Sequence, residues 1–196
     1  MEMNENKRIK GVIKLSNPIK SYDGTELPEL EYDADEITIE LYRKYVAEAG
    51  NADMLFHLLG AAAVNAVNPK LDRTDINRLR GSDLNKLKNI GAEYVRNSAE
   101  YEITEDAGTI ELTNPIVTPS GEEISVLRYD NNAMTLDAYL AALEGTNAGF
   151  EESVSVGFAS ILAAEKLEKS VLNRIKGNDC MKVSKIGANF IRTADE

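Results

Sequence analysis

Few side chains in this chain of 196 residues have the chemistry of a nucleophile, base or metal ligand. It contains one histidine, His57, and one cysteine, Cys180. A serine or cysteine nucleophile needs a base such as imidazole, and His57 lies within the apolar run LFHLL. Cys180 aligns with Leu84 in the internal repeat described below, which favours a small core residue. We therefore expect His57 at a helix surface or core edge, and neither residue in catalysis.

Two pairs of aspartates recur at matching positions. Asp33 and Asp130 directly follow an expected strand, where a short acid usually completes a turn or caps a helix. Asp83 and Asp179 fall in the first turn of an expected helix, whose dipole favours an anion. No second acid recurs beside them, and the chain has no HExxH, CxxC, P-loop, GxGxxG or EF-hand motif. The sequence predicts a protein that is not an enzyme and uses no metal or cofactor.

These positions match because one pattern occurs twice in the chain. Residues 13–19 read IKLSNPI, and residues 110–116 read IELTNPI. When residues 11–67 are compared with the residues 97 positions later, 16 of 57 positions are identical. When residues 71–97 are compared with those 96 positions later, a further 10 of 27 are identical. Composition alone would give roughly one match in fifteen. We interpret the chain as a tandem duplication.

Each copy predicts the same order of elements. KGVIKLSNPIK and GTIELTNPIV alternate apolar and polar residues, as strands with one buried face do. Gly24 and Gly121 mark a turn before a second strand, and Thr38 and Thr135 are expected helix N-caps. Gly60 and its match Gly157 fall inside an expected helix and predict a closely approaching neighbour. The predicted fold class is α+β, with two tandem repeats, each an antiparallel β-hairpin followed by three to four short α-helices.

The repeat also predicts the domain boundaries. A lone two-stranded hairpin is marginally stable, so the hairpins are expected to pair with each other or with a partner chain. The predicted ranges are 1–97 for the first repeat (hairpin about 9–33, helices about 38–97), 98–107 for a linker, and 108–196 for the second repeat (hairpin about 108–130, helices about 135–194).

Charge and hydropathy restrict the classes of partner. The net charge is −11, with 14 Lys/Arg and 16 Asp/Glu in residues 1–99 (−2) and 8 and 17 in residues 100–196 (−9). Such a chain repels nucleic acid and anionic membranes on average. The longest apolar run, 58–64, is too short to cross a bilayer, and a single cysteine suits a reducing compartment. We expect a cytoplasmic protein with no membrane contact.

The basic residues concentrate in two matching spans, 70–96 and 166–192, with net charges of +3 (7 − 4) and +5 (7 − 2). One interpretation is a solvated helix face that balances the acidic hairpin regions. The other is a docking surface for an acidic partner or for the acidic half of another subunit. A helix-turn-helix is not favoured, because the start of the last helix in each copy carries few basic residues.

The repeated motifs resemble a known family. LSNPIKSYDG, LPELEYD and a following Thr in the first copy match LTNPIVTPSG, ISVLRYD and Thr in the second. Together with INRLRGSDLNKLKNIGAEYV and LNRIKGNDCMKVSKIGANFI, this order resembles the tail assembly chaperones of tailed bacteriophages. The closest resemblance is to the small proteins encoded beside the tape measure protein of contractile-tailed phages and prophages. Each copy corresponds to about one family-sized unit.

The resemblance implies a protein that coats the long, helical tape measure protein and keeps it soluble before the tail tube assembles, in the bacterial host cytoplasm. A homo-oligomer is expected, and nucleic acid is not an expected partner. The alternatives are a self-assembling structural component of a tail or injection machine, and a nucleic-acid-binding or regulatory module using the basic helices. The candidate partner-binding residues, for which plain core is the alternative role, are Leu58, Leu59, Ala62, Val67, Val156, Ala159, Ile161, Arg78, Arg80, Lys86, Arg174, Lys176 and Lys182.

Overall fold

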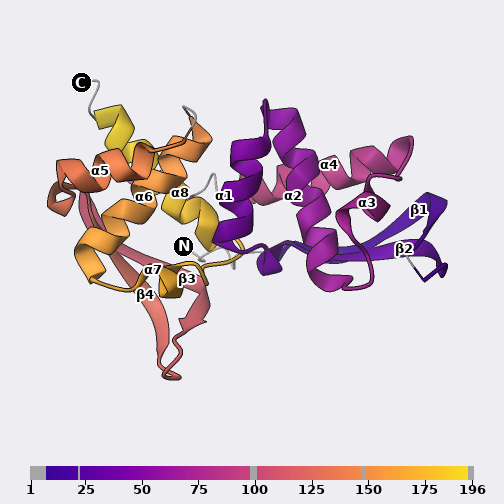
Figure 1. Ribbon diagram of the computed structural model, residues 1–196, viewed down its shortest axis with the longest axis horizontal. Coiled ribbons are helices and arrows are strands. Elements are labelled where there is room, and N and C mark those ends of the chain that lie inside the picture. The colour runs from indigo at the N-terminus through magenta and orange to yellow at the C-terminus, as the bar shows by residue number, and fades with distance from the viewer. Residues whose placement is uncertain (1–7, 22, 98–100, 147–148, 194–196) are drawn as a thin grey trace, which may run out of the picture. The chain divides into compact units, whose positions relative to one another are not determined.

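The computed structural model describes residues 8–21, 23–97, 101–146 and 149–193, which form a mixed α+β protein (Figure 1). These ranges contain two two-stranded antiparallel sheets and eight α-helices, so the predicted α+β class is confirmed. The elements of the first half are β1 (Lys10–Lys20), β2 (Glu26–Asp33), α1 (Ile39–Glu48), α2 (Ala52–Val67), α3 (Arg73–Ile76) and α4 (Ser82–Asn97). Those of the second half are β3 (Ala107–Val117), β4 (Glu123–Asp130), α5 (Leu136–Leu143), α6 (Phe150–Glu165), α7 (Lys169–Leu172) and α8 (Asp179–Thr193).

The two predicted hairpins are confirmed, and both carry the same irregularity. β1 pairs with β2 and β3 with β4, and each ladder shifts register around the Asn-Pro pair, between Lys14 and Ile19 and between Glu111 and Ile116. A bulge tolerates proline because proline has no N–H to give to the ladder. In the part of the chain that the structure describes, each sheet has two strands, so the hairpins do not pair with each other.

The chain divides into two compact units whose composition differs from the predicted domains. Unit 1 comprises residues 1–37 and 48–97, and unit 2 comprises residues 38–47 and 98–196. The segment 38–47, which contains nearly all of α1, therefore belongs with the second half of the chain rather than with the first repeat. The predicted linker 98–107 is described from residue 101, with Ile103 buried and Ala107 already in β3.

Short polar side chains begin the helical parts as predicted. The Thr38 and Thr135 hydroxyls accept the backbone N–H groups of Leu41 and Ala138, at 3.3 and 3.2 Å. The Asp33 and Asp130 carboxylates cap the single 3₁₀ turns 34–36 and 131–133 that follow each hairpin. The expectation of a cap or turn role for these two aspartates is confirmed.

Two glycine-mediated helix crossings form the centres of the units. A Cβ on Gly60 of α2 would lie 2.0 Å from the Leu87 carbonyl oxygen of α4, and one on Gly157 of α6 would lie 1.9 Å from that of Val183 in α8. Each crossing is reciprocal, because a Cβ on Gly91 would meet the α2 backbone equally closely. The predicted close approach at these glycines is confirmed.

Candidate functional site

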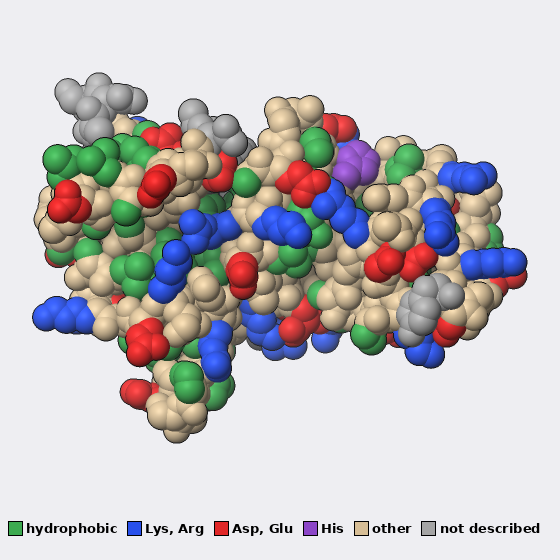
Figure 2. Space-filling model, in the orientation of Figure 1, with side chains coloured by type: hydrophobic (Ala, Val, Ile, Leu, Met, Phe, Trp, Pro, Cys, Tyr) green, Lys and Arg blue, Asp and Glu red, His purple; other side chains and the backbone are tan. Residues whose placement is uncertain are grey.

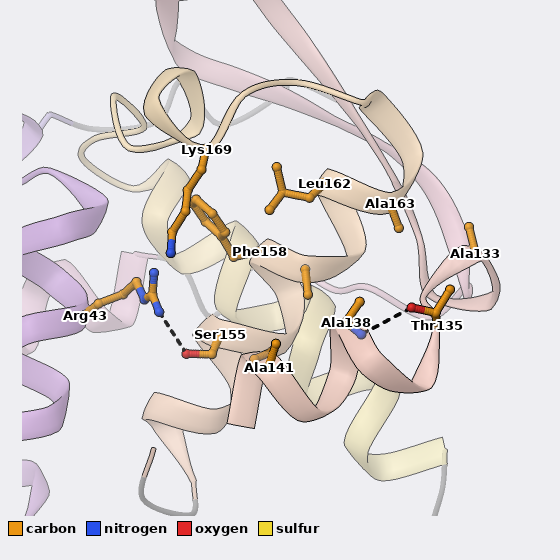
Figure 3. A pocket seen from close by; sticks show the side chains of 12 residues that line it. Arg43, Ala133, Thr135, Ala138, Ala141, Ser155, Phe158, Leu162, Ala163 and Lys169 are labelled. Atoms are coloured by element: carbon orange, nitrogen blue, oxygen red, sulfur yellow. Dashed lines mark hydrogen bonds between the residues drawn. The ribbon is translucent and has the colours of Figure 1, made fainter. Parts of the chain in front are cut away.

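Unit 2 contains a cavity of about 420 Å³ that is bounded by α1, α5 and α6 and by the start of α7 (Figure 3). This volume suits one or two large side chains or a small ligand. The cavity is open to one side of the unit, and α1 contributes Arg43 to its lining.

Small apolar side chains form most of the cavity wall. Ala138, Ala141 and Ala142 of α5 are spaced three and four residues apart, so they share one helix face. Leu162 of α6 lies opposite them, with further alanines from α6. The Thr135 cap fixes the first turn of α5, which directs this face toward α6 (Figure 3). Small side chains leave space that a larger apolar side chain of a partner can fill.

Two cations and an aromatic ring form one end of the cavity. The Arg43 guanidinium lies 5.4 Å from the centroid of the Phe158 ring and donates a hydrogen bond to the Ser155 hydroxyl at 3.3 Å. Lys169 points toward the same end (Figure 3). An apolar wall beside two positive charges suits an amphipathic segment that places an acidic residue next to an apolar one.

Backbone and buried side chains hold α1 in unit 2. The Ile39 N–H donates to the Ile175 carbonyl at 2.7 Å, and Thr38 forms an antiparallel bridge with Lys176. Tyr42 is fully buried. Burial raises the pKa of the Tyr42 hydroxyl, and nearby Cys180 on α8 raises it further. Arg43 is thereby fixed at the cavity.

A buried carboxylate and a lysine connect each hairpin bulge to a helix. Asp83, at the start of α4, accepts the backbone N–H groups of Ser16 at 2.9 Å and Asn17 at 3.2 Å. Lys86 donates to Asp83 and to the Lys14 carbonyl, at 2.7 and 2.6 Å. Burial alone would raise the pKa of the Asp83 carboxyl, but the hydrogen bonds from Lys86 and the two amides lower it below its usual value.

The second unit repeats this arrangement at corresponding positions. Asp179 accepts the N–H groups of Thr113 and Asn114 at 2.9 and 2.8 Å, and Lys182 donates to the carbonyl of Glu111 at 2.6 Å. Sequence reasoning recognised these aspartates only as acids in a first helical turn. The stronger signal was the recurrence of Asp with Lys three residues later, opposite a recurring Asn-Pro.

Most of the apolar residues that the sequence assigned to partner binding lie in the cores. The exceptions are Val67 and Ala159, which are half-buried, and Ala159 lines the cavity. The others, which are covered by neighbouring elements and not available to a partner in this conformation, are Leu58, Leu59, Ala62, Val156 and Ile161.

The predicted basic surface is divided among separate roles. Lys86 and Lys182 belong to the carboxylate contacts, and Lys182 is buried. Arg174 donates to the Val117 carbonyl at 2.6 Å, and Arg78 pairs with Asp75 at 3.2 Å. Lys176 lies in the bridge to α1, and Arg80 is exposed. The six residues therefore make separate contacts. Nothing in the sequence indicated the cavity or Arg43, and Lys169 was indicated only as one of the basic residues of the span 166–192.

The two residues with catalytic chemistry lie where the sequence predicted. His57 is half-exposed on α2, with Nδ1 2.8 Å from the Asp53 carbonyl oxygen, and Cys180 is fully buried. In the described ranges, no group of three His, Cys, Asp or Glu side chains could hold a metal ion. None of the helices described there is long and apolar enough to span a membrane.

Comparisons with known protein families, with curated proteins and with solved structures give no match.

Proposed function

We propose that this chain is a tail assembly chaperone that binds the tape measure protein of a contractile-tailed phage in the host cytoplasm. The observation that carries the proposal is the alanine-walled cavity between α5 and α6, with Arg43 and Lys169 at one end. A long helical protein presents amphipathic helices that aggregate when uncovered. A large apolar side chain of such a helix fills the cavity, and an adjacent acid pairs with the two cations. Shielding of this kind requires no catalysis.

We further propose that the two halves of the sequence are copies of one duplicated module. Supporting this, the hairpin bulges occur at positions 97 apart, and the Asp83 and Asp179 contacts at positions 96 apart.

Co-expression with the tape measure protein that this proposal expects to be encoded beside the chain tests the proposed function. The wild-type chain is expected to raise the soluble fraction of that protein and to co-purify with it. Ala141→Trp fills the cavity from an exposed position on α5 and is expected to abolish both effects. Ala66→Trp, at an exposed alanine of α2 outside the cavity, is the matched control and should behave as wild type.

Two results would contradict the proposal. If the tape measure protein is no more soluble with the wild-type chain than without it, the chaperone function is wrong. If Ala141→Trp and Ala66→Trp both retain binding, the cavity is not the binding site. Retention of the chain in purified particles would instead support the alternative of a structural tail component.

A further inference from the structure

Helix α5, which the structure describes in full, has no buried residue although most of its side chains are apolar. Leu136 is 69% exposed and Leu140 is 54% exposed. Hydrophobic side chains gather over α5 in the space-filling view (Figure 2). In α1, which matches α5 in the internal repeat, Ile39 is the counterpart of Leu136 and is fully buried. An apolar helix face left in water marks a surface that binds another molecule.

This leucine face of α5, formed by Leu136 and Leu140, points away from the cavity of unit 2. Ala138 lines the cavity and lies two residues from each leucine, so the leucines point about 160° away from it around the helix. Tyr139 packs against Phe190 of α8, with ring centroids 5.5 Å apart, and holds α5 in this orientation. The leucine face and the cavity therefore cannot meet within one chain, and each is available to another copy.

The charges of α5 and of the cavity are opposite. The segment 136–144 contains two acids, Asp137 and Glu144, and no cation, and both acids are exposed. The described residues that line the cavity include two cations, Arg43 and Lys169, and no acid. Opposite charges on two surfaces steer them together and fix the orientation in which they bind.

The shapes of the leucine face and the cavity also correspond. Leu136 and Leu140 are one helical turn apart and lie side by side on α5, and Asp137 neighbours Leu140 three residues along. The cavity of about 420 Å³ has room for one or two large side chains and carries its cations at one end. Helix α5 is therefore itself a segment in which an acid lies next to apolar side chains, which is the kind of segment that the cavity suits.

We propose that the leucine face of α5 in one copy of this chain docks in the cavity of a second copy, with Asp137 beside Arg43 and Lys169. Each copy contributes one helix face and one cavity, so the contact is heterologous. Such contacts continue from copy to copy and produce a ring or an open filament. The inference rests on the cavity of the proposed function, where a second copy and the tape measure protein compete, but self-association itself requires no client.

Sedimentation of the full chain, with no other protein present, tests the leucine face. The average mass of the wild type is expected to increase with concentration. Leu140→Lys places a cation where the cavity already has two and removes an apolar contact, so it should weaken association about tenfold or more. Val126→Lys is the matched control, because Val126 is 45% exposed on β4, outside both α5 and the cavity, and this variant should assemble as the wild type does.

An exchange of charges tests which surfaces meet. Asp137→Lys and Lys169→Glu each place like charges in the contact, so each variant alone should associate about three- to tenfold more weakly. A mixture of the two variants is expected to recover wild-type association. In that mixture the Asp137→Lys helix meets the Lys169→Glu cavity, and the unchanged helix meets the unchanged cavity. Circular dichroism should show that all the variants remain folded.

Four outcomes would overturn the proposal. The wild type could stay monomeric at every concentration, or Leu140→Lys could assemble as well as the wild type. The mixture of Asp137→Lys and Lys169→Glu could associate no better than either variant alone. Val126→Lys could weaken association as much as Leu140→Lys, which would show a general effect of added charge.

The variants also separate this proposal from the proposed function. Leu140→Lys should lose self-association and still bind the tape measure protein, because its cavity is intact. Ala141→Trp fills the cavity and should lose both interactions. A wild type that self-associates but leaves the tape measure protein insoluble would contradict the proposed function and support the contact between copies.

Discussion

At the scale of single residues, the buried aspartates replace a missing strand partner. In the bulges, the N–H groups of Ser16, Asn17, Thr113 and Asn114 are bonded to carboxylates rather than to the opposite strand. Leaving a buried N–H unpaired costs about 1–3 kcal/mol of stability, so two unpaired N–H groups in one bulge would strongly destabilise the fold. The carboxylates therefore allow the Asn-Pro bulge to exist next to a packed helix.

Substitution of Asp83 should be strongly destabilising. Asp83→Asn removes the charge opposite Lys86 and introduces a donor facing the Ser16 N–H, so we expect a loss of about 3–5 kcal/mol in the free energy of unfolding. Asp53→Asn is the matched control, because Asp53 pairs with Lys88 at the surface and should cost at most about 1 kcal/mol. Urea unfolding measures both, and similar losses would contradict the argument.

The same carboxylate predicts a dependence of stability on pH. The pKa of Asp83 is lower in the folded state than its ordinary value of 3.8. Its ionised form therefore stabilises the fold at pH above 3.8, and this contribution disappears as the pH falls through the lower folded pKa. The difference in unfolding free energy between wild type and Asp83→Asn should be constant from neutral pH to about pH 5 and shrink in stronger acid. A difference that grows on acidification would have the wrong sign.

At the scale of elements, the glycine crossings set the distance between the paired helices. Any side chain at Gly60 or Gly157 meets a backbone carbonyl rather than a flexible side chain, so the helices themselves must separate. Separation would weaken the contacts along the whole crossing, because protein interiors are close-packed. The pairs α2–α4 and α6–α8 therefore form the packed centres of unit 1 and unit 2.

Gly60→Ala should therefore destabilise unit 1 by about 3 kcal/mol or more, which is the upper end for overpacked cores. Gly50→Ala is the control, since a Cβ there meets nothing within 4 Å and its backbone is not left-handed. The control should be neutral or slightly stabilising, because alanine restricts the unfolded chain. Thermal unfolding gives the melting temperatures of the Gly60→Ala and Gly50→Ala variants. Equal melting temperatures would mean that α2 and α4 can separate without loss of stability.

The elements that the sequence predicted well are those specified by local patterns. The hairpins followed from alternation and turn glycines, the caps from Thr38 and Thr135, and the crossing from Gly60 and Gly157. The position of α1 was not predictable in this way, because a helix with a buried apolar face gives no sign of which surface covers it. The cavity was missed for the same reason, since Arg43 and Ser155 are 112 positions apart.

At the scale of the whole molecule, unit 2 depends on a segment from the N-terminal half of the chain. Ile39, Tyr42 and Val46 are buried in unit 2, although the rest of that unit begins only at residue 98. Damage to α1 should consequently be detected in the second half of the sequence. Neither half of the chain corresponds to a complete unit 2.

Tyr42→Ala tests this dependence. Removing a buried aromatic side chain usually costs about 3–5 kcal/mol, and here the loss should be detected as faster hydrogen exchange in α8. Leu87→Ala in α4 is the comparison, since Leu87 is buried in unit 1 and should accelerate exchange in α2 and α4. If Tyr42→Ala leaves exchange in α8 unchanged, α1 does not stabilise unit 2.

The membership of α1 in unit 2 also affects how the chain is synthesised. Ile39 bonds to Ile175, which is added to the chain 136 residues later (175 − 39). At about 5–20 residues per second, α1 waits roughly 7–27 s on the ribosome before its binding surface exists. During that interval its apolar face has no partner within the nascent chain. A newly made copy is thus most prone to aggregation midway through translation, after its first hairpin has emerged and before α8 has been made.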